Sequence, residues 1–477
     1  MLFNSFIFLL FFPIVCAIYW SIRSLNSRGN SLKYRNLFLL LMSYYFYMSW
    51  QPKYALLLLT STGVTYWAAR LMVKLQCEKQ KLRCLLGTIA INLAILFFYK
   101  YYNFVAESIT NCLEAMGLVM KVPGFDILLP VGISFYIFQA LGYLIDVYRG
   151  EIKAERNFIT YALFISFFPQ LVAGPIERSK NLLKQFKEDR AFDGEFALSG
   201  LKLMLWGYFM KLCLADRCAQ YVDAVFNDLS GHEGFSTLIA SILFSFQIYG
   251  DFAGYTFIAI GCARIMNFSL NDNFHRPYFA TTITDFWHRW HISLSTWLRD
   301  YVYFPLGGSR TTNSKTYRNI FITFLVSGIW HGANWTFVLW GVLHGVIQCI
   351  ERALGWSKET WTGFERFTRV ICTFVIATIA WVLFRANNLY DAFVALRLMV
   401  TPNDLQLNMG KMDILFSVVA IFIILIKEYA EEMSLARVHQ KIQNTGKWAI
   451  RFYLASMIVL IGSLGVFDGG KFIYFQF

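Results

Sequence analysis

A histidine lies in an apolar stretch where a titratable side chain is costly to bury. His331 occurs in Ser-Gly-Ile-Trp-His-Gly-Ala-Asn-Trp, residues 327–335, and residues 319–350 are otherwise hydrophobic. We expect this imidazole at membrane depth, where an ionisable group marks a functional site by default. Gly328 and Gly332 remove side chains beside the ring, so another chain or a substrate can approach the backbone closely.

A buried neutral imidazole is suited to general-base catalysis. Burial disfavours the charged form, so the ring of His331 can accept a proton at neutral pH. Beside an activated acyl donor, it would deprotonate a hydroxyl for attack on the acyl carbon. No Gly-x-Ser-x-Gly motif stands near His331, which favours direct transfer over an acyl-serine intermediate. From the residues alone, a structural polar contact is an equal alternative.

A second polar and aromatic cluster lies in the long loop between residues 263 and 318. With helical spacing, Asp285, His288 and His291 fall three residues apart and share one face. Carboxylate and imidazole can share a divalent ion, but the chain has only seven histidines and no second His-x-x-His pair, so we predict no metal site. The favoured alternative is an interfacial helix anchored by its aromatic residues, which are Trp287, Trp290 and Trp297.

Two further polar residues interrupt apolar runs. Gln139 lies within residues 129–148, and Asp251 lies within 235–262. Asp251 could belong to an ion path, as in a transporter. We favour a cap on a helix broken between Gly250 and Gly254.

Several residues near these motifs are weaker candidates for lining a tunnel or binding a donor. Basic side chains in the loops could hold the phosphates of a cytoplasmic donor, although most are explained by the positive-inside distribution. The tunnel and donor candidates are Trp330, Asn334, Trp287, Arg289, Arg299, Asp300, Gln139 and Asp251.

The composition indicates a polytopic helical membrane protein. The chain is 57% hydrophobic and 18% aromatic, and its mean hydropathy is +0.47. We expect an all-α integral membrane protein forming one domain over residues 1–477, and we interpret the first apolar run as a retained helix. The apolar runs are 2–22, 37–50, 54–73, 84–99, 129–148, 197–214, 235–262, 319–349, 370–384, 414–426 and 452–467.

Loop charges predict an orientation. Placing the basic segments in the cytoplasm gives about ten crossings and puts both chain ends outside. Residues 157–175 and 319–350 then become two re-entrant segments, which need protein or a water-filled cavity around them. Anionic lipid accounts for the net charge of +13 without a nucleic-acid partner. The basic segments are 23–35, 74–83, 149–156 and 175–190, against the acidic segment 215–234.

Five long stretches together resemble the membrane-bound O-acyltransferase (MBOAT) family, in its alginate O-acetyltransferase branch. Peptidoglycan O-acetyltransferases and the D-alanyl transferase of teichoic acid synthesis are related. The stretches are LLPVGISFYIFQALGYLIDVYRG (128–150), FISFFPQLVAGPIERS (164–179), FHRPYFATTITDFWHRWHISLSTWLRDYVYFPLGG (274–308), FLVSGIWHGANWTFVLWGVLHG (324–345) and WVLFRA (381–386).

The resemblance implies a ring of helices around a thin core, with a tunnel in which a cytoplasmic donor meets an outside acceptor. The active-site region would span about residues 128–350. His331 is similar to the family's catalytic histidine, and His291 to the second histidine associated with activity. Arginine is common in the family at the position of His288, and the acidic residue often found after the Gly-Tyr pair is missing at Thr256. Those two departures put only the roles of these positions in doubt.

We therefore expect an O-acyltransferase of a bacterial cytoplasmic (inner) membrane. It would move an acetyl group from acetyl-coenzyme A, without a bound cofactor, to a polysaccharide hydroxyl, directly or through a periplasmic partner protein. Peptidoglycan acetylation and D-alanyl transfer are alternatives that genomic neighbours would separate. A lipid or acyl-carrier transporter is the alternative from another class, although we see no internal repeat. An inactive scaffold is the last, and the presence of both histidines argues against it.

Overall fold

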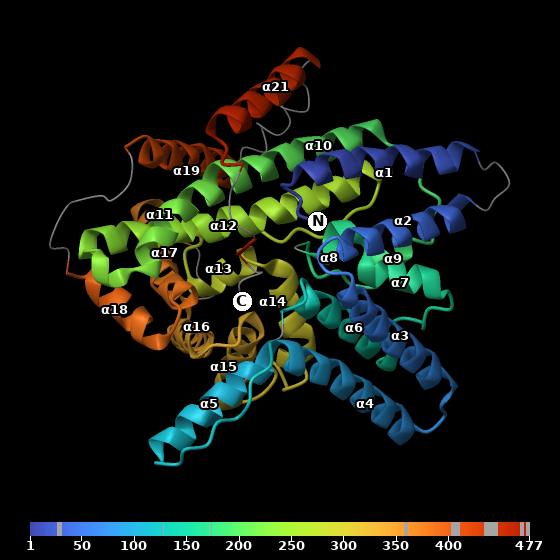
Figure 1. Ribbon diagram of the computed structural model, residues 1–477, viewed down its shortest axis with the longest axis horizontal. Coiled ribbons are helices and arrows are strands. Elements are labelled where there is room, and N and C mark those ends of the chain that lie inside the picture. The colour runs from blue at the N-terminus through green and yellow to red at the C-terminus, as the bar shows by residue number, and fades with distance from the viewer. Residues whose placement is uncertain are drawn as a thin grey trace. The chain divides into compact units, whose positions relative to one another are not determined.

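The computed structural model describes the chain as a set of helices (Figure 1). It describes residues 1–25, 31–126, 128–172, 174–356, 361–401, 411–433, 447–467 and 472–473, and within these ranges no residue is in a β-strand. The all-α prediction is confirmed. Arg28 of the basic segment 23–35, and His439, lie outside the described residues.

One compact unit comprises residues 1–201 and 259–271. In it α3 packs against α4, α6 and α7, and α2 packs against α1 and α7. Its elements are α1 (Phe6–Leu25), α2 (Ser31–Met48), α3 (Lys53–Lys74), α4 (Glu78–Leu96), the π-helix η1 (Phe97–Tyr101), α5 (Tyr102–Ala115), α6 (Ile133–Tyr148), α7 (Phe158–Ser166), α8 (Phe168–Leu171) and α9 (Leu182–Gln185).

The second unit comprises residues 202–258 and 272–477. The helices α10 (Gly194–Tyr208) and α12 (Gly234–Ile265) each have residues in both units. The other elements are η2 (Phe209–Ala215), α11 (Asp216–Asn227), η3 (Leu229–Gly231), η4 (Pro277–Phe279), α13 (Ile283–Arg289), α14 (Ile292–Leu298), η5 (Arg299–Tyr303), α15 (Asn313–His331), α16 (Trp335–Ala353), α17 (Gly363–Arg385), α18 (Leu389–Met399), α19 (Lys411–Glu432) and α21 (Lys447–Leu464).

Six stretches of the described chain are long and apolar enough to cross a membrane. The chain is therefore a multi-pass membrane protein, while the predicted count of about ten crossings stays a prediction. The six are Phe6–Ser24, Lys53–Lys74, Glu78–Ala115, Gly194–Asn227, Gly234–Ile265 and Gly363–Arg385, and the shorter apolar helices are Ile133–Tyr148, Phe158–Leu171 and Trp448–Leu464.

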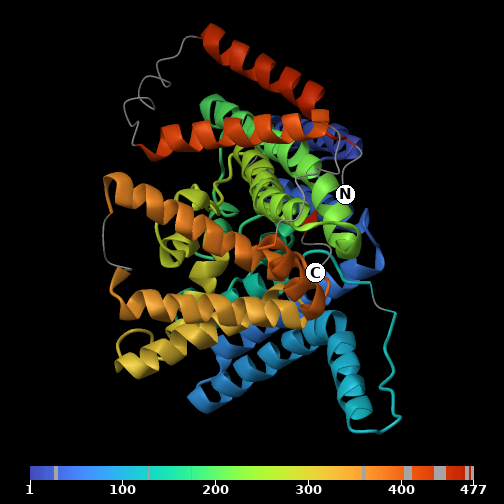
Figure 2. The ribbon, with the colours of Figure 1, turned by 90° about the vertical axis from the view of Figure 1, so that its left-hand side faces the viewer.

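The predicted re-entrant segment 319–350 forms a hairpin of α15 and α16, which pack against each other side by side (Figures 1 and 2). Its re-entry into the membrane stays a prediction. Two glycines face each other at the crossing. A Cβ added to Gly328 would lie 2.4 Å from the Phe337 carbonyl oxygen, and one added to Gly341 would lie 2.5 Å from the Phe324 carbonyl oxygen. Only glycine permits so close an approach of two helices. In Figure 2, α17 follows as the next neighbour of α16.

The other predicted re-entrant segment, 157–175, contains two short helices. Asn157 caps α7, accepting the Ile159 and Thr160 N–H groups, and the chain turns at Phe167 before α8. A nine-residue helix rises only about 14 Å, roughly half of a bilayer's hydrocarbon core. Neither helix is long enough to cross alone.

The prediction that α12 breaks between Gly250 and Gly254 is wrong. This helix runs without interruption from Gly234 to Ile265. The glycines serve close packing instead, because a Cβ on Gly250 would lie 2.8 Å from the Met210 carbonyl oxygen, and one on Gly254 would lie 2.8 Å from the Gly207 carbonyl oxygen.

Candidate functional site

His331 is the last residue of α15 and lies among aromatic rings. Its side chain is 2% exposed. The ring centroid is 4.9 Å from that of Trp340, 5.0 Å from that of Trp330 and 5.3 Å from that of Phe384, each with an edge-on geometry. Two of these rings come from the neighbouring helices α16 and α17, so packing between helices fixes the position of the imidazole.

His291 is placed by a break between α13 and α14. Its backbone is left-handed, with φ 45° and ψ 50°, a conformation that costs energy in any residue with a side chain. Because α13 ends at Arg289, the prediction that His291 shares a helical face with Asp285 and His288 is wrong. His288 is exposed, whereas His291 is fully buried.

The fold brings the two predicted histidines together. The ring centroids of His291 and His331 are 6.4 Å apart, and the ring of Trp330 contacts both. Phe252 packs edge-on against His291 with centroids 4.7 Å apart. Burial lowers the pKa of His291 to about 3, so this imidazole is neutral at pH 7. The arrangement therefore offers two close imidazoles in a water-poor, aromatic setting.

A hydrogen bond orients the His291 ring. Its Nδ1 atom lies 3.1 Å from Oδ1 of Asn273, which is fully buried and also accepts the N–H and hydroxyl of Ser293. The sequence interpretation did not single out Asn273. Its only signal was a polar residue directly before the FHRPYF stretch.

A pocket of about 320 Å³ lies beside the two histidines. It is bordered by Ser327, one helical turn before His331, and by Ile292, the residue after His291. Neither imidazole lines it, so the predicted passage through His331 stays a prediction. Polar groups are contributed by Thr284, His288, Ser295, Thr296, Arg299, Tyr303, Thr323, Gln348 and Arg352, and apolar walls by Trp287, Leu294, Leu298, Ile320 and Phe324.

The helix before His291 is held at both ends. At its start, Glu351 of α16 accepts the Ile283 and Thr284 N–H groups at 2.6 and 2.8 Å. Carboxylates are favourable at helix N-termini. At its end, Arg289 bonds to Asp285 at 2.8 Å and to Glu432 at 3.0 Å. Arg289, a predicted donor-binding residue, therefore lies in an ion network and not in the pocket.

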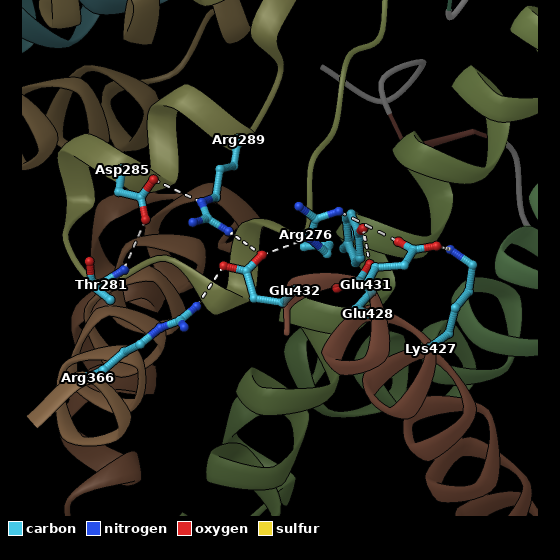
Figure 3. A network of polar contacts seen from close by, with 10 residues as sticks. Arg276, Thr281, Asp285, Arg289, Arg366, Lys427, Glu428, Glu431 and Glu432 are labelled. Atoms are coloured by element: carbon cyan, nitrogen blue, oxygen red, sulfur yellow. Dashed lines mark hydrogen bonds and ion pairs between the residues drawn. The ribbon is translucent and has the colours of Figure 1, made fainter. Parts of the chain in front are cut away.

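Glu432, near the end of α19, is the centre of that network (Figure 3). It accepts Arg276 at 2.8 Å and Arg366 at 2.7 Å in addition to Arg289. These cations come from the loop before α13, from α13 itself and from α17. One carboxylate thus joins three segments around the His291 region.

The candidate Asp251 belongs to a buried ion cluster. Lys211 of the π-helix η2 lies 2.7 Å from carboxylate oxygens of both Asp216 and Asp251. The second oxygen of Asp251 accepts the Ile473 N–H at 2.6 Å. The sequence interpretation missed Lys211, although a lysine inside the apolar run 197–214 was a visible signal.

The remaining candidates have structural partners. Asn334 caps α16 by accepting the Thr336 N–H at 3.0 Å, and its amide donates to the Asn387 carbonyl. Gln139, in the other unit, donates to the Phe164 carbonyl at 2.6 Å. Arg299 lines the pocket, is half exposed and pairs with Asp300 at 2.9 Å.

Trp287 and His344 form a hydrogen bond beside the pocket. The Trp287 indole N–H donates to His344 Nδ1 at 3.3 Å, so His344 takes part in the packing of α13 against α16. Within the described ranges, no three His, Cys, Asp or Glu side chains are grouped so that they could hold a metal ion.

Comparison with known proteins gives consistent matches. The family model described as MBOAT, membrane-bound O-acyltransferase family, matches residues 150–393. A probable alginate O-acetylase of Pseudomonas putida is 40% identical over 415 residues, covering 86% of this chain and 82% of the relative. A peptidoglycan O-acetyltransferase of Helicobacter pylori is 36% identical over 401 residues, covering 78% and 75%.

A more distant relative is named for the transfer of a different acyl group, D-alanyl. A teichoic acid D-alanyltransferase of Bacillus subtilis is 28% identical over 275 residues, covering 55% of this chain and 69% of the relative. Both histidines lie inside the residues matched by the family model.

Proposed function

Because the chain belongs to the membrane-bound O-acyltransferase family and is an O-acyltransferase, we propose that it acetylates hydroxyl groups of an extracytoplasmic polysaccharide. The donor is an acyl thioester, acetyl-coenzyme A, supplied from the cytoplasm. The observation that carries the proposal is the pairing of two buried imidazoles, 6.4 Å apart, beside a pocket with polar and apolar walls.

In the proposed reaction, His331 is the general base. Its imidazole takes the proton of the acceptor hydroxyl as the hydroxyl oxygen forms a bond to the thioester carbonyl carbon. The carbon–sulfur bond then breaks, and the thiolate leaves with the proton returned by the imidazolium. The products are an ester and a free thiol, so no metal or redox partner is needed for the balance.

The pocket is the proposed site of the donor's thioester arm. Its apolar walls suit an acyl chain and its linker, and the exposed Arg299 with Arg352 provides cations for phosphate. Ser327 and His331 lie one turn apart on α15, so an acyl group bound against Ser327 would be close to the imidazole. Trp287 forms part of the same wall.

The acceptor and the setting are further parts of the proposal. The similarity to named alginate O-acetylases favours an alginate-like exopolysaccharide, reached directly or through a periplasmic partner protein. We place the chain in the bacterial inner membrane as one integral domain, with both ends outside, as the basic loops predict. Peptidoglycan acetylation is the second candidate because of the Helicobacter relative.

The proposal is tested by acetyl transfer in purified protein. Protein in detergent is incubated with acetyl-labelled coenzyme A and a soluble oligosaccharide acceptor, alginate-derived or peptidoglycan-derived. We expect labelled ester with wild type and a loss of about 10²–10⁴-fold in rate with His331→Ala. The matched control is His275→Ala, because His275 is half exposed and pairs only weakly with Asp272 at 4.0 Å. Undiminished transfer by His331→Ala would remove the mechanism.

The identity of the acceptor polymer is tested in a separate experiment. Acetyl analysis of surface polymers from a strain lacking the protein identifies which polymer loses its esters. Loss from peptidoglycan alone would replace the alginate-like acceptor by the second candidate. Transfer of lipid across vesicles by the purified protein, without ester formation, would favour a transporter instead.

A further inference from the structure

The orientation of the Asn273 side chain follows from its contacts. Its Oδ1 atom lies 3.1 Å from the Ser293 backbone nitrogen and 2.9 Å from the Ser293 hydroxyl oxygen. A peptide N–H can only donate, so the atom that faces it must be the amide oxygen and not the amide nitrogen. This contact excludes the flipped amide.

The same oxygen decides the protonation of His291. Its Nδ1 atom is 3.1 Å from Oδ1 of Asn273. Because the amide oxygen only accepts, Nδ1 must carry the hydrogen, and in a neutral imidazole the lone pair then lies on Nε2. We propose that Asn273 is a positioning residue that fixes this tautomer and makes Nε2 the basic atom of His291.

The backbone supports the same geometry. The Ile292 N–H donates to the Asn273 carbonyl at 3.0 Å, and the His275 N–H donates to the Arg289 carbonyl at 2.9 Å. These bonds hold residues 273–275 beside the break that contains His291. His291 itself has the left-handed conformation, with φ 45°, and its ring contacts Asn273.

The surroundings of His291 are aromatic and include the titratable His331. From α12 it meets Phe252, and from α15 it meets Trp330 and the titratable His331. The charged groups nearby along the chain are bound elsewhere. Asp251, beside Phe252, pairs with Lys211, and Arg289 pairs with Asp285 and Glu432.

A neutral amide suits this setting better than a carboxylate. An aspartate in place of Asn273 would stabilise the imidazolium, as opposite charges do. Asparagine orients the ring while leaving it neutral. The inference rests on the proposed function for its consequence, which is that Nε2 of His291 accepts a hydrogen bond from the acceptor hydroxyl or from protonated His331.

The tautomer is measured directly, without any activity. Full-length protein labelled with ¹⁵N-histidine has seven histidines, and the spectrum of His291→Gln assigns the His291 signals. At pH 7 we expect a protonated Nδ1 and an unprotonated Nε2, and loss of that single tautomer in Asn273→Ala. A protonated Nε2 in wild type, or an unchanged tautomer in Asn273→Ala, would overturn the proposal.

The pH profile gives the second test. In Asn273→Asp we expect the acidic limb of the kcat profile to move upward by about 1 pH unit or more, since the carboxylate favours the imidazolium. The matched control is Asn157→Asp, the same change at the cap of α7, where aspartate is an equally good cap. Its profile should equal that of wild type.

The two tests distinguish failure of the proposed function from failure of the positioning role of Asn273. Wild-type protein without acetyl transfer contradicts the proposed function, while the labelled spectrum still decides the role of Asn273. An active Asn273→Asp with the wild-type pH profile contradicts the positioning role alone. If Asn273→Asp does not fold, the spectrum of wild type and Asn273→Ala decides the question.

Discussion

The second unit contains two buried clusters of polar side chains, and the two clusters are stabilised in different ways. In the ion cluster, Lys211 lies 2.7 Å from an oxygen of Asp216 and 2.7 Å from an oxygen of Asp251. In the histidine pair, His291 and His331 lie among aromatic rings. Charges are matched by charges in the first, and imidazoles are packed against aromatic rings in the second.

This difference indicates which cluster stabilises the fold and which one suits the reaction. A lysine held between two carboxylates keeps its charge, because removing either sign leaves the other uncompensated in an apolar interior. An imidazole can accept a proton and release it again, which general-base catalysis requires. We therefore assign the ion cluster to stability and the histidine pair to the reaction.

The largest effect on stability is expected when the ion cluster is disrupted. Lys211→Met leaves two buried carboxylates without their cation and should lower the free energy of unfolding by about 3–5 kcal/mol. Thermal unfolding in detergent measures the loss. Lys427→Met is the matched control, because Lys427 pairs with Glu431 at the surface and such pairs contribute about 0–1 kcal/mol.

A rescue experiment tests the same prediction more strictly. Adding Asp216→Asn and Asp251→Asn to Lys211→Met removes the uncompensated charges, so part of the stability should return. Wild-type unfolding behaviour in Lys211→Met would contradict the assignment of the cluster to stability.

The second prediction concerns the histidine pair and its coupling. His291→Ala and His331→Ala should each keep a folded protein and reduce acetyl transfer by about 10²-fold or more. Because both act on one reaction, the double variant should lose far less than the product of the single losses. Fully multiplicative losses would show that the two imidazoles act independently.

The third prediction tests the network in Figure 3. Glu432→Gln removes the charge that three arginines share and should cost about 1.5–3 kcal/mol of stability, the range for hydrogen bonds to charged groups. Denaturation of purified protein gives the value. Glu431→Gln is the control, since Glu431 is more exposed, pairs with Lys427 at 2.7 Å and lies 3.8 Å from only one of the three arginines, Arg276. Equal effects of the two changes would contradict the central role of Glu432.

The last prediction is a dependence of stability on pH. Burial lowers the pKa of His291 to about 3 from an ordinary 6.5, so between these values the unfolded chain binds a proton that the folded chain does not. The contribution of His291 to the free energy of unfolding is fully present above pH 6.5. It decreases as the pH falls toward 3, by at most about 1.4 kcal/mol per pH unit.

The measurement compares wild type with His291→Gln. Unfolding temperatures at pH 7 and pH 5 should decline less in the variant, which lacks the titrating group. Identical declines would show that His291 does not contribute to acid sensitivity.

Much of the fold was predictable because membrane helices are specified by local apolarity. The all-α class and the hairpin of α15 and α16 follow from runs of apolar residues and from loop charge. The break in α12 was predicted wrongly, because Gly250 and Gly254 permit close packing as readily as a broken helix. Sequence spacing cannot distinguish these uses of glycine.

The candidate site was predictable only in part. His331 and His291 were identified as candidates, but the spacing of Asp285, His288 and His291 suggested a shared face that the end of α13 prevents. Asn273 and Lys211 were missed because their partners lie far along the chain or in another element.

The sequence by itself determined the helical membrane class and the family, and it identified the two histidines, since each rests on composition or on a contiguous motif. The tertiary structure decided which groups meet: Asn273 with His291, His291 with His331, and Lys211 with Asp216 and Asp251. The physical reason is that protonation and charge pairing depend on distances of a few ångströms between side chains. Helix packing sets those distances, and no local pattern encodes them.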